Sequence, residues 1–313
     1  MKYISKKVMS SIITILIVSF LVFFAFSVIP GDPAVAKLGT QATPQKVNAL
    51  REQMGLNRPL IIRYFEWVKG VVIGDFGTSY SYNMPVTQMI ADKVPVTVFL
   101  TLFSFLIMII ITILVGIFSA RKEGTLIDKT IQVLNQIIMS IPPFFSGVLI
   151  TLIFGMIFRL FTPGGYVSYQ TNFIKFMAYL FFPAFSIALP KSAMAVKLLR
   201  TSLLEEKKKD YVRTAYSRGN STKDVFYHHI LKNACIPVIT FSAMALADMI
   251  AGSIIIEQVF GIPGLGRILL TSIQNRDYPV VEAVILCIAF MVILINLLVD
   301  MIYRKVDPRI TVG

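Results

Sequence analysis

The chain is organised around Lys209-Asp-Tyr-Val-Arg-Thr-Ala-Tyr-Ser-Arg-Gly219, a polar stretch that lies between two long apolar segments. The whole polar interruption, residues 197–236, holds nine Lys or Arg and four Asp or Glu. Short loops rich in Lys and Arg are retained on the cytoplasmic side of a membrane. We therefore predict that residues 197–236 face the cytoplasm and dock a partner protein there.

Within this loop the residue pattern predicts two short helices separated by a hinge. Gly219 and Asn220 end the first helix, because these residues enter the left-handed backbone conformation at the lowest steric cost. Ser221 caps the second helix through the backbone N–H of Asp224, and Asp224 is placed to reach back in a capping box. An apolar stripe on the second helix predicts contact with the rest of the protein. The stripe comprises Phe226, Tyr227, Ile230, Leu231 and Ala234. An ordinary interfacial helix that only connects two membrane spans is an equal alternative.

The composition is that of a protein with several membrane spans. Apolar residues make up 56% of the 313 residues, and the mean hydropathy is +0.73, which is too high for a soluble domain. The net charge of +13 does not predict nucleic-acid binding, since more than half of the 30 Lys and Arg fall in segments assigned to the cytoplasm. The two cysteines, Cys235 and Cys287, indicate neither a disulfide framework nor a metal site.

Six apolar segments are long enough to cross a hydrocarbon core of about 30 Å as helices. We predict an all-α membrane protein with six transmembrane helices and with both termini in the cytoplasm. The predicted spans are residues 8–29, 96–119, 131–161, 173–196, 237–258 and 281–302. The chain then divides into a cytoplasmic N-terminus with the first span (1–30), an external loop (31–95) and a five-helix core (96–313). A cleaved signal peptide is the alternative for the first segment, although the apolar part of a signal peptide is only about 7–15 residues long.

Loop 31–95 has helix signals of its own. Thr43 and Pro44 predict an N-cap and a first helical residue, and Gly55 predicts the end of that helix. A second amphipathic helix is predicted over residues 60–69, with Gly70 after it. We therefore expect loop 31–95 to be partly helical, and its simplest function is to brace the spans.

Two features of the predicted spans suggest a path for a substrate. Pro142 and Pro143 interrupt the third span, and such breaks are tolerated in a membrane only where protein or a wet cavity satisfies the freed backbone groups. Asp248 lies in the middle of the fifth span, where a carboxylate costs on the order of 2.5–3.5 kcal/mol. Lys191, near the inner end of the fourth span, is expected to extend toward the headgroups. We hypothesise that Asp248, Pro142 and Pro143 line the pathway; a kink that only fits the bundle and a hydrogen bond between helices are the alternatives.

The polar loop resembles a known family at Tyr211-Val212-Arg213-Thr214-Ala215, followed by Gly219. It is similar to the cytoplasmic coupling loop of the permease subunits of binding-protein-dependent ABC importers, in the branch that carries dipeptides, oligopeptides and nickel. Arg213 and Thr214 stand at the first two places of the wider importer pattern Glu-Ala-Ala, and Lys232 stands where that pattern has a proline. Further motifs similar to this branch are Pro30-Gly31-Asp32-Pro33, Arg58-Pro59-Leu60, Gly74-Asp75-Phe76-Gly77, residues 257–267 and Asp307-Pro308-Arg309-Ile310.

The resemblance implies a transport subunit that works with other chains in the bacterial cytoplasmic membrane. The implied partners are a second related permease, two ATP-binding cassette ATPase subunits, an extracellular or periplasmic substrate-binding protein and the lipid bilayer. ATP and Mg would be used by the ATPase subunits, and this chain would bind no cofactor. Coupling to the ATPases is assigned to Asp210, Tyr211, Val212, Arg213, Thr214, Ala215, Gly219, Ser221 and Asp224. Arg267, Arg276 and Asp277 are candidate contacts with the substrate-binding protein, and local ion pairs are the stronger alternative for these three residues.

The sequence predicts no enzymatic activity, because it has no Gly-x-x-x-x-Gly-Lys-Ser/Thr loop for ATP. His228 and His229 are adjacent on a helix, which points their rings about 100° apart and disfavours a shared metal ion. Peptide uptake is the predicted function, with nickel or metal-chelate uptake as the alternative in the same branch. An ion-coupled secondary transporter would need a relay of ionisable residues, whereas Asp248 is the only one predicted well inside a span. A membrane scaffold without transport explains the loops but not the kinked spans.

Overall fold

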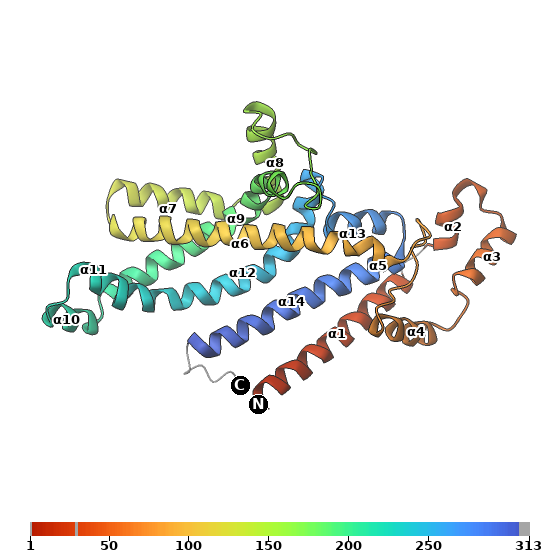
Figure 1. Ribbon diagram of the computed structural model, residues 1–313, viewed down its shortest axis with the longest axis horizontal. Coiled ribbons are helices and arrows are strands. Elements are labelled where there is room, and N and C mark those ends of the chain that lie inside the picture. Colours follow the sequence, from red (N-terminus) through yellow and green to blue (C-terminus); the bar gives the residue numbers. More distant parts are fainter. Residues whose placement is uncertain (1, 29–30, 307–313) are drawn as a thin grey trace. The chain divides into compact units, whose positions relative to one another are not determined.

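The computed structural model describes residues 2–28 and 31–306, and within these ranges the chain is almost entirely helical (Figure 1). Of the sequence motifs, Pro30 and residues 307–310 lie outside the described ranges. The chain divides into two compact units. The first unit comprises residues 1–97 and 263–297, and the second comprises residues 98–262 and 298–313.

The first unit is built around the packing of α4 (Leu60–Val72) on α1 (Lys2–Val28). Tyr64 is buried between these helices, with its hydroxyl 3.0 Å from Ser19 Oγ and its ring against Phe23. The other elements of the unit are α2 (Pro33–Leu38), a 3-10 turn (Gly39–Gln41), α3 (Pro44–Gln53), α5 (Val86–Ala91), the first residues of α6 (Lys93–Arg121), α13 (Leu265–Gln274) and α14 (Tyr278–Val306) as far as Leu297.

Loop 31–95 is helical where its sequence signals predicted helices. Thr43 caps α3 with its side chain, and Pro44 is the first residue of that helix. Gly55 follows α3 with a φ of +67°, the left-handed conformation that glycine adopts without strain. α4 continues through Gly70, which the sequence had placed after the end of the helix, because one glycine inside a helix costs only about 1 kcal/mol.

Asp277 joins two segments of the first unit that are far apart in the sequence. Its carboxylate accepts hydrogen bonds from Ser79 Oγ–H (2.5 Å), Tyr80 N–H (2.8 Å) and Ser81 N–H (3.2 Å). The residue is 0% exposed. The prediction that Asp277 contacts a substrate-binding protein therefore does not hold, because its side chain is fully used inside the unit.

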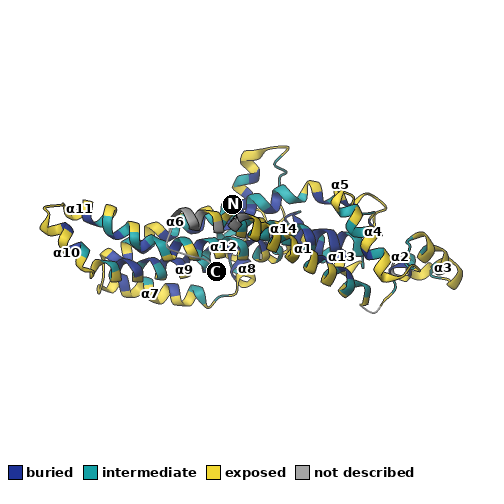
Figure 2. Ribbon diagram, turned by 90° about the horizontal axis from the view of Figure 1, so that it is seen from below, coloured by how far each residue is buried: buried dark blue, intermediate teal, exposed yellow. Residues whose placement is uncertain are grey.

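The second unit has its core where α9 (Phe173–Lys207) packs on α12 (Leu231–Phe260), and both helices carry many buried residues (Figure 2). α7 (Leu126–Met139) and α8 (Pro143–Ile150) also pack on α9. A Cβ atom at Gly147 of α8 would lie 2.8 Å from Ile256 Cδ1 of α12, so this close approach favours glycine. The remaining elements are α6 from Val98 onward, a π-helical turn (Thr151–Ile157), α10 (Asp210–Ser217), α11 (Thr222–Asp224), a second π-helical turn (Val225–Ile230) and α14 from Leu298 onward.

Five helices of the described chain are long and apolar enough to cross a membrane. A sixth span arises if α7 and residues 143–157 count as one, but these segments are bent by 105° to each other. The third predicted span is thus two helices, broken where the paired prolines predicted a break. α9 continues past residue 196 to Lys207, since the Leu, Glu and Lys residues there favour a helix. α12 begins at Leu231 and keeps Pro237 inside it.

A buried ion pair holds three helices of the second unit together. Asp128, in the first turn of α7, is 1% exposed. It accepts hydrogen bonds from Arg200 Nε and Nη2 of α9, both at 2.7 Å, and from Ser119 Oγ–H of α6, also at 2.7 Å. Gly124 N–H donates a further hydrogen bond at 3.1 Å. Because all four contacts converge on one carboxylate, they set how α6, α7 and α9 meet; the sequence had not singled out this aspartate.

We expect Asp128→Ala to destabilise the protein by about 3–5 kcal/mol, because it leaves the Arg200 guanidinium partly buried without its partner. The matched control is Glu123→Ala, which breaks the exposed ion pair of Glu123 with Lys207 and should cost less than about 1 kcal/mol. Denaturant unfolding of both variants in detergent measures the difference. Equal destabilisation by the two variants would show that the buried pair does not organise these helices.

Candidate functional site

The candidate site is the polar loop, in which α10 is fastened to the rest of the second unit by one face. Val212 and Ala215 are 3% and 6% exposed. They belong to a buried apolar cluster with Leu203 of α9 and with Val225 and Ile230 of the segment that leads into α12. α10 is therefore packed together with the end of α9 and with the π-helical turn that precedes α12.

The other face of α10 is open (Figure 2). Arg213 lies 3.9 Å from Asp210, and the two side chains are 83% and 98% exposed, so this weak pair leaves both free to meet a partner. The exposed residues of this helix are Asp210, Arg213, Thr214, Tyr216 and Ser217. Among the residues predicted for ATPase coupling, the structure thus separates Val212 and Ala215, which anchor α10, from Asp210, Arg213 and Thr214, which face outward.

Glu206 ties the start of α10 to the end of α9. Its carboxylate accepts hydrogen bonds from the Tyr211 hydroxyl (2.6 Å) and from Lys209 Nζ (2.5 Å). Burial, together with the neighbouring carboxylate, raises the pKa of Tyr211, so its phenol stays protonated and able to donate. The same carboxylate raises the pKa of Lys209, which keeps that ammonium charged.

The predicted hinge lies between α10 and α11. Gly219 has a φ of +82°, and no atom lies within 4 Å of the position that a Cβ would take. Ser221 Oγ accepts a hydrogen bond from Asp224 N–H (3.2 Å), as predicted. The Asp224 carboxylate accepts a hydrogen bond from the Ser221 hydroxyl (2.5 Å), so the two side chains bond to each other. A substitution at Gly219 therefore acts through backbone strain alone and not through a steric clash.

The π-helical turn changes the register of the segment after the hinge. Val225 is 0% exposed, whereas Tyr227, which the helical wheel placed on the apolar stripe, is 48% exposed. The wheel was wrong at this position because a π-helical turn has more residues per turn than the α-helix that it assumed. Tyr227 instead accepts a hydrogen bond from Arg121 Nη2 (3.0 Å), and the Arg121 guanidinium lies over the Phe226 ring at 4.9 Å.

The pathway candidate Asp248 has a partner that the sequence did not predict. Lys191 Nζ of α9 lies 2.6 Å from Asp248 Oδ2 of α12. Lys191 therefore does not extend toward the headgroups as predicted; packing of α9 on α12 brings it to a carboxylate. The Asp248 side chain is nevertheless 64% exposed. Pro142 and Pro143 lie at the start of α8, with Pro142 as its N-cap residue.

The two arginines predicted to contact the substrate-binding protein differ in their surroundings. Arg267 is an exposed residue of α13. Arg276 has a φ of +56°, and its guanidinium lies so close to Gly31 that a Cβ there would overlap it. Arg276 therefore packs on loop 31–95 within the first unit. Among the described residues, no group of three or more His, Cys, Asp or Glu could hold a metal ion.

The chain matches two family models that describe one kind of protein. Residues 112–312 match the binding-protein-dependent transport system inner membrane component, and residues 1–101 match the N-terminal part of that membrane component. The chain therefore belongs to the family of inner membrane components of binding-protein-dependent transport systems. It is a multi-pass permease subunit of an ABC importer in the bacterial inner membrane.

Named relatives match over nearly the full length. A probable peptide ABC transporter permease of Sinorhizobium fredii is 33% identical over 308 residues, 98% of each chain. An oligopeptide transport system permease of Bacillus subtilis is 33% identical over 311 residues, 98% of each chain. A glutathione transport system permease of Salmonella choleraesuis is 33% identical over 310 residues, 99% of each chain. The fold is similar to a chain of the MetNI methionine ABC transporter, with a TM-score of 0.54 and 18% identity over 70% of this chain and 97% of that one.

We expect Val212→Ala to loosen α10, because it removes two buried methyl groups at about 0.8 kcal/mol each and leaves a cavity. Hydrogen exchange of the amides of residues 210–217 should become faster in this variant. The matched control, Arg213→Ala, changes an exposed residue on the same helix and should leave the exchange unchanged. Faster exchange only in the control would contradict the anchoring described for Val212.

Proposed function

We propose that this chain is the permease subunit of an ATP-driven importer that takes up short peptides. A second, related permease completes the pathway, two ATP-binding cassette subunits use ATP and Mg, and an external substrate-binding protein delivers the cargo. The relatives described above support peptides over nickel, because they are named for peptides, oligopeptides and glutathione, itself a tripeptide. Both termini and residues 197–236 then lie on the cytoplasmic side.

One observation carries the coupling mechanism: α10 is anchored on one face and open on the other. Val212 and Ala215 connect it to α9 and α12, while Asp210, Arg213 and Thr214 remain available to an ATPase subunit. Closure of the two ATPase subunits would displace α10, and the anchored helices would carry that displacement into the spans. Gating between two states of access follows from such a rigid-body movement.

Substitutions at the Gly219 hinge test this coupling in the complete, reconstituted importer. Gly219→Val strains a left-handed backbone position by roughly 1–2 kcal/mol and should reduce ATP-dependent peptide uptake about tenfold, while ATP hydrolysis continues. Gly219→Asn is the matched control, because asparagine tolerates this conformation, and it should keep most of the uptake. Wild-type uptake by the Gly219→Val importer would refute a coupling role for this loop.

We further propose that the exposed side of the Lys191–Asp248 pair faces the translocation pathway, beside the break at Pro142 and Pro143. A charged pair inside a span is too costly to face lipid, so protein or water must cover the exposed part of Asp248. The bend of 105° at the prolines frees backbone groups that a wet cavity can satisfy. Arg267 on α13 remains a proposed contact for the substrate-binding protein, and Arg276 a proposed support for that surface.

Cysteine accessibility tests the pathway side of α12. In a background with Cys235 and Cys287 changed to serine, Met244→Cys should react with a membrane-impermeant thiol reagent, because Met244 is 65% exposed one turn before Asp248. The rate should change when ATP is added to the assembled importer. Ala245→Cys is the control, since Ala245 is 1% exposed. Equally slow labelling of the two cysteines in every state would place this side of α12 away from water.

A further inference from the structure

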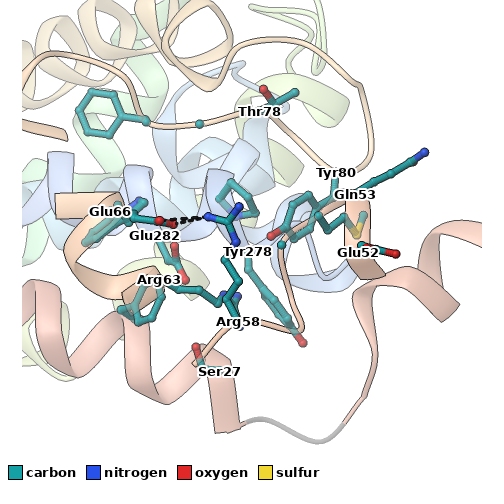
Figure 3. A pocket seen from close by; sticks show the side chains of 17 residues that line it. Ser27, Glu52, Gln53, Arg58, Arg63, Glu66, Thr78, Tyr80, Tyr278 and Glu282 are labelled. Atoms are coloured by element: carbon teal, nitrogen blue, oxygen red, sulfur yellow. Dashed lines mark hydrogen bonds and ion pairs between the residues drawn. The ribbon is translucent and has the colours of Figure 1, made fainter. Parts of the chain in front are cut away.

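A cavity of about 470 Å³ lies within the first unit (Figure 3). Its volume is in the range of small-molecule sites, roughly 300–1,000 Å³. Five segments of the unit contribute to its wall: the C-terminal part of α1, the end of α3, α4, the loop before α5 and the first turns of α14. The polar side chains used below are Arg58, Arg63, Glu66, Trp67, Tyr80, Tyr278 and Glu282.

Several polar groups in this wall are buried but have no hydrogen-bond partner. Trp67 Nε1 and the Tyr278 hydroxyl are buried and unpaired within the described part of the chain. Glu282 is 6% exposed, and its carboxylate forms no hydrogen bond with the described residues. Buried polar groups in folded proteins are nearly always paired, and two of the five exceptions among the described residues, Trp67 and Tyr278, lie in this wall.

The charges of the cavity are opposite and only partly matched. Arg58 Nη1 lies 3.0 Å from both carboxylate oxygens of Glu66, so these two side chains form an ion pair with each other. Arg63 and Glu282 both line the cavity, and within the described part of the chain they form no ion pair with each other. The Arg63 guanidinium and the buried Glu282 carboxyl group therefore face the same space without direct contact. A ligand carboxylate would pair with Arg63, and a ligand ammonium would favour the ionised form of Glu282, so a zwitterion satisfies both groups.

The rest of the wall suits a small ligand of this kind. Arg63 lies 5.8 Å from the centre of the Phe23 ring, which limits the directions that its side chain can take. Burial raises the pKa of Tyr80 to about 12, so its hydroxyl stays neutral beside Arg63. Aromatic faces from Phe23, Trp67 and Tyr278 provide apolar contact beside the charged groups.

We propose that this cavity binds a short zwitterionic peptide, with its ammonium group at the Glu282 carboxylate and its carboxylate at Arg63. The choice of a peptide among zwitterions rests on the proposed function. The cavity is then a second place where the permease meets its cargo, on the unit that carries loop 31–95.

Tryptophan fluorescence can report binding in this cavity, because Trp67 in its wall is the only tryptophan of the chain. The full-length chain in nanodiscs, without ATPase subunits or substrate-binding protein, is titrated with L-alanyl-L-alanine while tryptophan emission is recorded. We expect a saturable change in emission. N-acetyl-alanyl-alanine, which lacks the ammonium, and alanyl-alanine amide, which lacks the carboxylate, should each bind about tenfold more weakly or worse.

Variants at Glu282 and Arg63 test which residue binds each end of the ligand. Glu282→Gln should weaken binding of the free dipeptide about tenfold but hardly change binding of its N-acetyl form, which lacks the ammonium. Arg63→Gln should likewise weaken binding of the free dipeptide but hardly change binding of the amide, which lacks the carboxylate. Glu123→Gln, a carboxylate change in the second unit, is the control and should bind as the wild type does. Circular dichroism and gel filtration check the fold of each variant. If Glu282→Gln does not fold, the three wild-type ligands still decide the question.

Two outcomes overturn the proposal: no binding of the dipeptide by the wild-type chain in fluorescence and in equilibrium dialysis, or equal binding of all three ligands. Uptake by the complete importer separates this result from the proposed function. Peptide uptake without binding to the isolated chain removes the cavity site and leaves the function standing. Dipeptide binding without any peptide uptake leaves the cavity site and removes the function.

Discussion

The second unit depends on the buried carboxylate of Asp128, on which α6, α7 and α9 converge through Ser119 and Arg200. Charge removed from water must be paired, and here the pairing is bidentate and completed by a hydroxyl and a backbone N–H. These contacts require α6, α7 and α9 to lie close together at Asp128. Arg200 lies near the C-terminal end of α9, which continues to Lys207 and leads into the polar loop.

The polar loop is nearly continuous with the long helices on both sides of it. α9 leads to α10 after two residues, and α11 passes through a π-helical turn directly into α12. Val212 and Ala215 belong to the same buried apolar cluster as residues of α9 and α12, so α10 is packed and does not hang free from the ends of these helices. Gly219 is the one residue of the loop with a left-handed backbone conformation, and it is exposed.

Most local signals were reliable, with Gly70 inside α4 as the exception. The caps at Thr43 and Ser221, the turns at Gly55 and Gly219 and the break at Pro142 and Pro143 were all predicted, because each depends on residues within one or two turns. The other failures have two causes. Tyr227, Asp277 and Lys191 were misplaced because their surroundings are set by a π-helical turn or by partners 57 to 198 residues away.

Residue types and their order alone determined an all-helical membrane protein, the basic loop that marks its family and the points where helices begin, break and end. These properties follow from transfer of apolar side chains out of water and from backbone geometry, both of which act along the chain. Only the tertiary structure decided which charges are neutralised and which remain exposed: Asp128 with Arg200, Asp248 with Lys191, and Glu282 near Arg63 without direct contact. Electrostatic pairing depends on distances between helices, and no spacing in a sequence contains those distances.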